Sequence, residues 1–321
     1  MTPAEAKETR EGVAFSNLDQ PLFEGSDATK RDLVDYLDGI SGRILPELRR
    51  RPLSVIRVHR GEGAFMQKNL PKYTPPWVDR VTMWAESSKR DVTYALCDDR
   101  RTLLWFANQR AIEYHPSLAQ VEAPDRITHI VLDLDPPPEA TFSTAVAAAR
   151  LVRQVLADAG LGGALKTSGA KGLHVFVPID LGTPPEEAAA ATRAIAERAA
   201  ALDPSLATTA FMKEDREGKV FVDATRVAGA TVVSAYSPRA RPGTPVSLPV
   251  SWEEVDDIVP SSITIRNALD VIGVRDPWAQ QMPEPQTVPP DLVAEGSEVR
   301  PGRVEAMHEG LRRARAKKAS S

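Results

Sequence analysis

The sequence predicts a mixed α/β or α+β domain. Short β-branched segments and long amphipathic segments occur along the same chain, and this combination is typical of sheets packed against helices. The two kinds of segment do not alternate strictly, which argues against a doubly wound parallel sheet. The chain has 321 residues, of which 42% are apolar and 26% are charged, so it is long enough to bury a sizeable core.

The first third of the chain is expected to contain two helices and two strands. A helix begins near Ser26–Asp27, because the apolar residues after it recur at helical spacing. Residues 52–60 are rich in β-branched side chains and predict a strand, whereas Gly and Pro punctuate residues 61–77 and predict a loop. A strand over residues 92–98 and a helix over residues 101–115 are expected to follow.

The rest of the chain is expected to hold further extended segments and two more helices. Thr183 and Glu186 form a capping-box pattern, which predicts the start of the second of these helices with proline at its first position. The extended segments cover residues 127–135, the two arms of residues 163–180 and residues 218–226, and the helices cover residues 141–160 and 186–202.

The composition limits the class of protein. A net charge of −4 argues against a surface that is basic throughout, although it leaves room for the local basic patches that nucleic acids bind. Cys97 is the only cysteine, so the chain can form neither an internal disulfide nor a cysteine-based zinc site, and a reducing compartment is expected. The N-terminus lacks the apolar core of a signal peptide and no apolar run approaches the length of a bilayer span. We therefore expect a soluble cytoplasmic protein.

Two aspartates end the strand expected over residues 127–135. Residues i and i+2 of a strand point to the same face, so Asp133 and Asp135 are expected to be neighbours. Such carboxylates repel each other unless a cation lies between them or one takes up a proton. Oxygen ligands suit Mg²⁺ or Mn²⁺ rather than zinc, which makes the pair a candidate metal site. An exposed strand end, with Asp135 starting a turn before Pro136, explains the same pattern without a metal.

A third aspartate extends the metal hypothesis. Asp223 lies late in an apolar strand, where a buried and unpaired carboxylate is costly. Three aspartates at two strand ends could hold two metal ions, and two metals stabilise the attacking and leaving oxygens of a phosphoryl transfer. A salt bridge from Asp223 to a nearby arginine such as Arg226 is the competing explanation.

A glycine-containing turn adds groups that suit a phosphate. Gly169 and Gly172 flank Lys171 in this turn, without the spacing of a P-loop. Ser168, Lys171 and His174 could converge on a phosphate through a hydroxyl, an ammonium and an imidazole. A surface hairpin with solvated charges is the alternative.

Three arginines supply further positive charge. Arg239 and Arg241 are two residues apart in an extended segment, so both point to one face, where guanidinium groups suit phosphate oxygens; a solvated edge is the alternative. Arg216 lies in a loop just before the strand of the third aspartate and could reach the same place.

His115 ends one of the expected helices, where histidine is a favourable end residue, so on its own it is not a candidate.

Four motifs in a fixed order resemble one known family. They are DLD at residues 133–135, SGAKGLH at 168–174, GKVFVD at 218–223 and YSPRAR at 236–241. Together they resemble the polymerase domain of bacterial DNA ligase D, a branch of the archaeo-eukaryotic primase superfamily (the primase-polymerases). The resemblance continues upstream through NLDQPLF, ATKRDL, KNLPKYTPPW and QRAIEYH. It implies a primase-polymerase fold of two packed α/β halves, with the active site in the cleft between them.

The resemblance also implies a domain organisation. It spans residues 13–275, which are expected to form the catalytic domain. Residues 1–12 are expected to be a flexible N-terminus. Residues 276–321 are expected to form a Pro-rich wrap or linker followed by a basic C-terminal tail, Arg312 to Lys318.

The family match implies a role for each candidate residue. Asp133, Asp135 and Asp223 would be the catalytic, metal-binding carboxylates, with Mn²⁺ or Mg²⁺ as two bound ions. An NTP or dNTP would be the substrate. The residues implied to bind this nucleotide, His115 now among them, are His115, Ser168, Lys171, His174, Arg216, Arg239 and Arg241.

The implied function is template-directed nucleotidyl transfer, by a DNA/RNA polymerase or primase that fills short gaps or extends ends in DNA repair, including non-homologous end joining. The implied partners are gapped, primed or end DNA, a separate ATP-dependent DNA ligase and an end-binding protein. The ligase is implied because the sequence, which shows no ligase or nuclease domain, resembles the stand-alone members. A non-catalytic DNA-end or gap-binding module is the alternative, and the intact carboxylates argue against it. A haloacid-type phosphatase would need Thr or Val where Pro137 stands.

A pocket for a DNA 5′-phosphate is implied as well, with departures from the family pattern. Asn17 and Lys30 match two of its residues, but Gln20 stands where the first of the family's two lysines is usual, so one charge-assisted contact is missing. Phe65 is the candidate for stacking on a template base, because Met66 follows it where the family often has a second aromatic residue. The expected DNA-binding residues are therefore Asn17, Lys30, Phe65 and Lys68.

Overall fold

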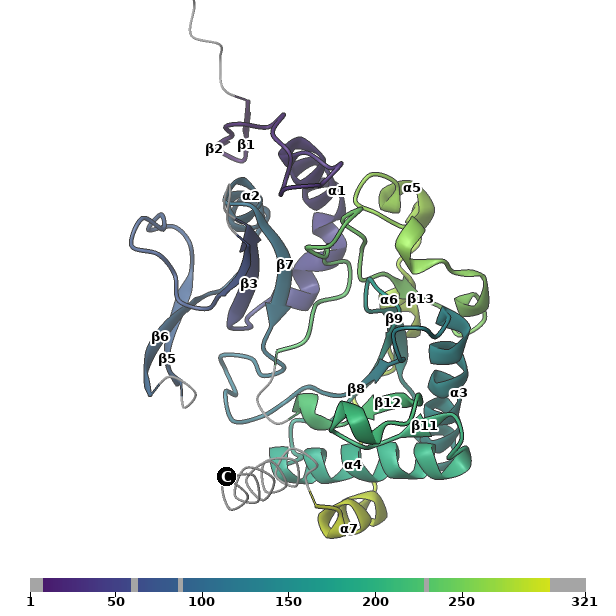
Figure 1. The fold of residues 1–321 in the computed structure, drawn as a ribbon. Coiled ribbons are helices and arrows are strands. Elements are labelled where there is room, and N and C mark those ends of the chain that lie inside the picture. Colours follow the sequence, from purple (N-terminus) through teal and green to yellow (C-terminus); the bar gives the residue numbers. More distant parts are fainter. Residues whose placement is uncertain (1–7, 59–62, 86–88, 228–230, 301–321) are drawn as a thin grey trace, which may run out of the picture.

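The computed structural model describes residues 8–58, 63–85, 89–227 and 231–300. In this part of the chain, two main sheets and the helices packed on them form two halves (Figure 1). The predicted mixed α/β or α+β class is confirmed.

The larger sheet has six strands in the order β11-β12-β8-β10-β9-β13. Its neighbouring strands are antiparallel, except for the parallel pair β11 and β12. Helices α3 and α4 pack against each other and against β8 and β12, so they cover the same face of the sheet (Figure 1). The elements are β8 (His129–Asp135), α3 (Phe142–Asp158), β9 (Ala164–Thr167), β10 (Leu173–Pro178), α4 (Pro185–Leu202), β11 (Ala207–Thr208), β12 (Val220–Asp223) and β13 (Pro249–Val250).

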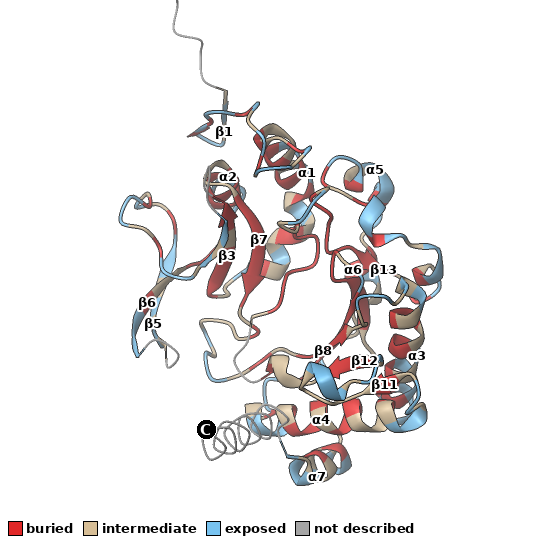
Figure 2. Ribbon diagram, in the orientation of Figure 1, coloured by how far each residue is buried: buried red, intermediate tan, exposed pale blue. Residues whose placement is uncertain are grey.

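The second sheet lies in the other half of the molecule. Strand β3 pairs with β4, β6 and β7, and β6 pairs with β5. Helices α1 and α2 pack against each other and against β7. Figure 2 shows buried residues along β3 and β7 but mainly exposed and intermediate residues along β5 and β6, so this hairpin extends away from the core. The elements are α1 (Lys30–Leu48), β3 (Leu53–Val58), β4 (Ala64–Gln67), β5 (Arg80–Ala85), β6 (Arg90–Ala95), α2 (Arg100–Asn108) and β7 (Ala111–Pro116).

The chain between β12 and β13 connects the two halves. Ser234 donates its backbone N–H to the carbonyl of Tyr114 in β7, at 2.9 Å. Further along, the carbonyl of Leu248 accepts from the N–H of Thr167 in β9, at 2.8 Å. This segment is therefore hydrogen-bonded to β7 of one half and to β9 of the other.

Helix α2 is shorter than the sequence predicts. The prediction is a helix over residues 101–115, but α2 ends at Asn108 and Ala111–Pro116 form β7. Arg110 has a positive φ of 56°, which a helix cannot continue through. His115 thus lies in a buried strand and not at a helix end, because pairing with β3 decides the structure of this segment.

Part of the predicted loop over residues 61–77 is also a strand. Ala64–Gln67 form β4, in which Phe65 pairs with Arg57 of β3. The Gly and Pro signals on either side are local, whereas the pairing comes from a strand elsewhere in the chain and overrides them.

Two helix starts differ from the predictions. Helix α1 begins after Thr29 and not near Ser26–Asp27, because Thr29 and Asp32 form a capping box, each accepting a hydrogen bond from the other's backbone N–H. The capping box predicted at Thr183–Glu186 is wrong. Helix α4 begins after Pro184 with no side-chain cap, since proline sets the helical φ at its start.

The Pro-rich wrap or linker expected from residue 276 onward contains helices. Proline is the first residue of both α6 (Pro277–Gln281) and α7 (Pro290–Glu298), which follow α5 (Ala268–Ile272). Helix α7 packs against α4 (Figure 1). None of the helices in the described ranges is both long and apolar enough to cross a membrane. The predicted basic tail lies in residues 301–321, outside the described residues.

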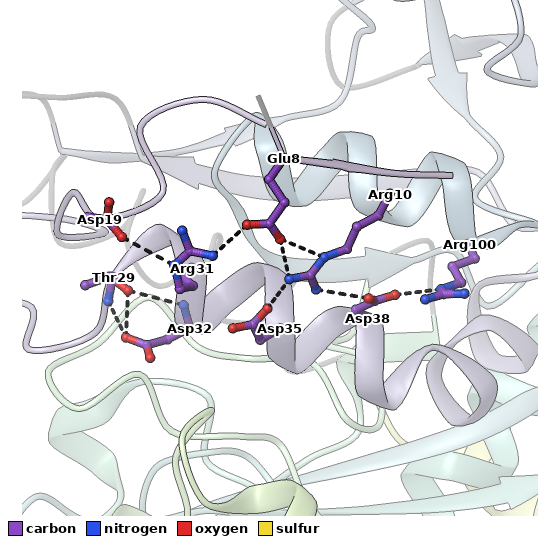
Figure 3. A network of polar contacts seen from close by, with 9 residues as sticks. All are labelled: Glu8, Arg10, Asp19, Thr29, Arg31, Asp32, Asp35, Asp38 and Arg100. Carbon is purple, nitrogen blue, oxygen red and sulfur yellow. Dashed lines mark hydrogen bonds and ion pairs between the residues drawn. The ribbon is translucent and has the colours of Figure 1, made fainter. Parts of the chain in front are cut away.

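An ion-pair network attaches the first described residues to α1 and α2 (Figure 3). Arg10 contacts Asp35 and Asp38 of α1 at 2.5 and 3.0 Å, and Arg100 of α2 contacts Asp38 at 2.6 Å. Part of the expected flexible N-terminus is therefore held against the fold, while residues 1–7 lie outside the described residues. The network adjoins a two-stranded sheet of β1 (Thr9–Arg10) and β2 (Val13–Ala14).

Candidate active site

A row of ionisable side chains crosses four strands of the larger sheet. Asp223 of β12 pairs in register with Asp133 of β8, Asp133 pairs with His174 of β10, and His174 pairs with Lys166 of β9. Cross-strand partners point to the same face of a sheet, and Asp135 points there too because it lies two residues from Asp133. All four members of the row are buried. The strand register thus assembles side chains that lie far apart in the sequence.

A cavity of about 680 Å³ opens over this row, within the size range of small-molecule sites. It receives side chains from both halves and from the segment that connects them. Asp223 lies beside the cavity, paired with Asp133. The other candidate catalytic and nucleotide-binding residues line it: His115, Asp133, Asp135, Ser168, Lys171, His174, Arg216, Arg239 and Arg241.

Arg226 lies between two of the aspartates. Its Nε and Nη2 atoms are 3.0 and 2.8 Å from Asp133 Oδ2, and its Nε is 3.2 Å from Asp223 Oδ2. The salt bridge that competes with the metal explanation for Asp223 is therefore present, and it extends to Asp133. Among the described residues, no three His, Cys, Asp or Glu side chains are grouped as they would be around a metal ion.

The aspartates of β8 differ in their electrostatic surroundings. Burial alone would raise the pKa of Asp133, but His174 and Arg226 beside it hold that pKa well below its usual range. Burial and the charge of Asp133 raise the pKa of Asp135 to about 6. Asp133 Oδ1 lies 3.2 Å from His174 Nε2 but accepts no well-aligned hydrogen bond. Asp133 and Asp135 therefore lie close together as two like charges, and a bound cation would relieve their repulsion.

Lys166 supports His174 from the far end of the row. Its Nζ lies 2.8 Å from His174 Nδ1 and donates to Ser247 Oγ at 2.7 Å. Burial and the nearby Arg239 lower the pKa of Lys166 well below its usual value. Burial and Lys166 lower the pKa of His174 to about 4, so this imidazole is neutral at pH 7. The His174 ring contacts Lys166 through Nδ1 and Asp133 through Nε2. Because Asp133 is ionised, both contacts are favourable when Lys166 donates to Nδ1 and the ring proton is on Nε2.

The turn between β9 and β10 closes one side of the cavity. Gly169 has a φ of 73°, which favours glycine, and a Cβ there would come within 2.4 Å of the Arg239 side chain. A Cβ on Gly172 would lie 2.5 Å from the carbonyl oxygen of Leu134. Ser168 Oγ accepts the N–H of Gly172 at 3.2 Å, and the Ser168 carbonyl accepts from Arg239. The two glycines thus let the turn pack tightly against β8 and Arg239.

Glu113 connects two of the predicted nucleotide-binding residues. Its Oε2 lies 2.9 Å from His115 Nε2 and 3.2 Å from Arg239 Nε, and its Oε1 accepts the N–H of Ala240 at 2.9 Å. Burial opposes the ionisation of Glu113, but the hydrogen bond from His115 and the charge of Arg239 lower its pKa to about 2. A buried anion on β7 therefore holds two side chains from different segments.

Three cations at the rim of the cavity are more accessible. Lys171 and Arg241 are exposed, and Lys171 donates to the carbonyl of Pro138. Arg216 stacks on Phe221, with its guanidinium 3.9 Å from the ring centroid, and donates to backbone carbonyls. The three positive charges line the same cavity as Asp133 and Asp135, so the cavity can attract an anion with bound divalent cations.

Residues 29–278 match the primase-polymerase domain of LigD, and they make up most of the chain. The chain belongs to the LigD primase-polymerase domain family. This result confirms the resemblance that the four ordered sequence motifs indicate.

Two curated LigD proteins illustrate the relationship. The multifunctional non-homologous end joining DNA repair protein LigD of Mycobacterium tuberculosis (strain H37Rv) is 34% identical over 257 residues, which cover 76% of this chain and 34% of that protein. The bifunctional non-homologous end joining protein LigD of Bacillus subtilis (strain 168) is 34% identical over 268 residues, which cover 81% of this chain and 42% of that protein. The chain thus spans less than half the length of these relatives.

A solved structure shares the fold. It is the polymerase domain from Mycobacterium tuberculosis ligase D in complex with DNA, with a TM-score of 0.75 and 32% sequence identity. The match covers 84% of this chain and 99% of the other. This chain therefore shares its two-half architecture with a polymerase domain whose structure was solved in complex with DNA.

The LigD primase-polymerase family implies the use of metal and nucleotide, and the donor set of this chain fits divalent cations. Asp133, Asp135 and Asp223 supply the hard oxygen ligands that Mg²⁺ and Mn²⁺ prefer. Burial and the charge of Asp133 raise the pKa of Asp135. Such crowding of carboxylates is expected of a cation site, although the Asp133 and Asp223 carboxylates contact Arg226 in this structure.

The LigD-type DNA contacts predicted at the N-terminus lie outside the cavity. Asn17 is exposed and has a φ of 57°. Lys30 is buried, and its Nζ donates to the Ser16 carbonyl at 2.7 Å and to Asn108 Oδ1 at 2.6 Å. Burial lowers the pKa of Lys30 to about 8. A DNA phosphate would therefore have to share Lys30 with these two oxygens, and the role of Lys30 stays a prediction.

The other predicted DNA contacts lie on or beside β4. Phe65 is half-buried within β4, with the guanidinium of Arg57 6.0 Å from its ring centroid. Lys68 is exposed just after the strand. Both roles stay predictions as well.

Lys166 and Glu113 are the site residues that the sequence analysis missed. A lysine inside the apolar run GGALKT is a signal for Lys166, because a buried lysine needs a partner. Glu113 and His115 are two residues apart and share one face of a strand, but this signal disappears when the segment is assigned to a helix.

Proposed function

We propose that this chain is a template-directed nucleotidyltransferase, a DNA/RNA polymerase that fills short gaps or extends ends during DNA repair. The observation that carries the proposal is the cavity of about 680 Å³, which is lined by carboxylates together with lysine and arginine side chains. A nucleoside triphosphate with divalent cations has the complementary charge pattern.

The side chains divide the work by charge. Asp133, Asp135 and Asp223 would hold two divalent cations, which when bound neutralise charge on the transferring phosphate and on the leaving pyrophosphate. Lys171 would bind and orient the triphosphate together with Arg216, Arg239 and Arg241, so that a primer 3′-hydroxyl can attack its α-phosphorus. The roles of the relatives, which are named for non-homologous end joining, support DNA ends or gaps as the substrate.

Primer extension tests this proposal. The purified protein is expected to add nucleotides to a gapped duplex with Mn²⁺, and Asp133→Asn should reduce incorporation by about 100-fold or more because it removes a ligand charge. Asp125→Asn, which changes an exposed aspartate away from the cavity, is the matched control and should leave incorporation unchanged. Absence of incorporation with both NTPs and dNTPs would refute the proposal.

The pairing of Arg226 with two aspartates favours a second candidate, a non-catalytic module that binds DNA ends or gaps. In that case the carboxylates would serve as structural partners of an arginine. DNA binding measured by fluorescence anisotropy, together with no incorporation by the native protein, would support this candidate over the first.

A further inference from the structure

Arg226 is a positively charged side chain of the cavity that contacts Asp133 and Asp223 directly. Its side chain is 35% exposed, and it lines the cavity between the ends of β12 and β8. Arginine keeps its proton in proteins even where it is partly buried. The guanidinium is therefore charged and is stabilised by the two carboxylates.

The carboxylates in turn need a cation. Asp133 and Asp223 are cross-strand partners on the same face, where two like charges destabilise a sheet. The guanidinium fork reaches the Oδ2 atoms of both, at 2.8 and 3.2 Å. Without a metal ion, the repulsion between the strand ends is thus offset by a side chain of the protein itself.

The atoms that Arg226 occupies are the ones that a metal ion would use. Asp133 Oδ1 is turned to His174, so Asp133 Oδ2 is its oxygen on the side of Asp223. A divalent cation bridging Asp133 and Asp223 would need the lone pairs that now accept from Arg226. The guanidinium and the metal ion therefore compete for the same carboxylates.

We propose that Arg226 is a built-in counter-ion for Asp133 and Asp223, which a divalent cation must displace in order to bind, so that Arg226 sets the metal affinity of the nucleotide-free protein. The inference rests on the metal-dependent function proposed above. Arg226 is here a positioning residue, because it acts through the carboxylates.

A different role for Arg226 predicts the opposite effect. If Arg226 held the carboxylates in the geometry that the metal ion needs, its removal would weaken metal binding. The direction of the change in affinity therefore separates the two roles.

Mn²⁺ binding tests the inference without any catalytic readout. Free Mn²⁺ is measured by electron paramagnetic resonance during titration of nucleotide-free native protein and of Arg226→Gln, Arg226→Lys and Lys219→Gln. We expect R226Q to bind Mn²⁺ about tenfold more tightly than the native protein, since a competing ion pair is lost. R226K should lie between them, because an ammonium keeps the charge but loses the fork.

K219Q is the matched control. Lys219 lines the same cavity but pairs with Glu217 at 2.9 Å, so its replacement removes one positive charge without freeing an aspartate. Its Mn²⁺ affinity should stay within about twofold of the native value. An equal gain in K219Q and R226Q would mean that general charge, and not competition at Asp133 and Asp223, sets the affinity, and would overturn the inference.

A second measurement covers the case in which R226Q is less stable. In EDTA, the melting temperature of R226Q should be lower than that of the native protein, and Mn²⁺ should raise it by more than it raises the native value. Unchanged or weaker Mn²⁺ binding in both Arg226 variants overturns the inference but leaves the proposed function intact. Tighter binding in R226Q without incorporation by the native protein refutes the function alone, and absence of Mn²⁺ binding in all variants refutes both.

Discussion

Glu113 is a buried carboxylate whose importance comes from the segments that it connects. It lies on β7, while Arg239 and Ala240 belong to the segment between β12 and β13. Its carboxylate contacts His115, Arg239 and the backbone N–H of Ala240 at the same time. A buried anion is stabilising when it has several such partners. Any role of His115 and Arg239 in nucleotide binding thus depends on Glu113.

Glu113→Gln should lower the free energy of unfolding at pH 7 by about 1–3 kcal/mol, because an uncharged amide replaces a buried anion beside Arg239. Urea denaturation measures this change. If nucleotide incorporation is observed, the KM for the triphosphate should rise more than kcat falls, since the variant disorders binding groups and leaves the aspartates in place.

The difference between E113Q and the native protein should depend on pH. The pKa of Glu113 is lowered in the fold from 4.5 to about 2, so its charge contributes stability above about pH 4.5. This contribution is lost as the pH falls from about 4.5 towards 2, and the two proteins should converge in that range. Glu122→Gln, which changes an exposed partner of Arg50, is the control and should show little effect. A constant difference between E113Q and the native protein at all pH values would contradict the assignment.

Helix α7 packs on α4 through a contact that only glycine permits. A Cβ on Gly296 would lie 1.8 Å from the carbonyl oxygen of Ala190 in α4, and this backbone atom cannot move aside alone. Arg193 and Arg198 of α4 also reach α7, through the Gly296 carbonyl at 3.0 Å and the Glu295 carboxylate at 2.6 Å. The C-terminal helix is therefore part of the layer that supports the larger sheet.

Gly296→Ala should separate α7 from α4 and destabilise the protein by about 1–3 kcal/mol, as overpacking of a close contact does. Amide hydrogen exchange of Pro290–Glu298 should become faster, and urea denaturation should report the loss. Gly42→Ala is the matched control, because Gly42 lies in α1 with open space around its Cβ position. It should stabilise the protein by about 0.5–1 kcal/mol. Equal effects of the two substitutions would refute the close-contact explanation.

Two buried tyrosines attach the segment between β12 and β13 to the elements on either side of it. Tyr36 on α1 is buried and donates its hydroxyl to the carbonyl of Tyr236, at 2.7 Å, in the segment that connects the halves. The hydroxyl of Tyr236 in turn donates to Asp276 at 2.6 Å. The first bond holds the segment that carries Arg239 and Arg241 against α1, and the second ties it to the start of α6, which packs on β9 and β13 of the larger sheet.

Tyr36→Phe should lower the free energy of unfolding by about 1–2 kcal/mol, because it removes the donor of a buried carbonyl without changing the volume of the core. Thermal and urea denaturation measure the change. Tyr73→Phe, at a tyrosine that is 59% exposed and accepts from Arg57, is the control and should have a smaller effect. A Y36F variant as stable as the native protein would show that this bond does not contribute to holding the halves together.

Local sequence patterns predict much of this protein correctly. The strand of IVLDLD, the hairpin around SGAKGLH and helix α3 follow from apolar periodicity and glycine positions, which are short-range properties. The alternation of side chains along a strand places Asp133 and Asp135 on one face without any tertiary information. The four motifs then identify the family, because this chain contains their characteristic residues in the same order.

The tertiary structure alone decides what depends on pairing between distant segments. Strands β4 and β7 form because β3 lies between them, and no local pattern shows this. The register of β12, β8, β10 and β9 places Asp223, Asp133, His174 and Lys166 side by side. It also leaves Arg226 within reach of two aspartates, so a salt bridge and a candidate cation site occupy the same atoms. Such contacts follow from strand register and helix packing, which are fixed only when the whole chain has folded.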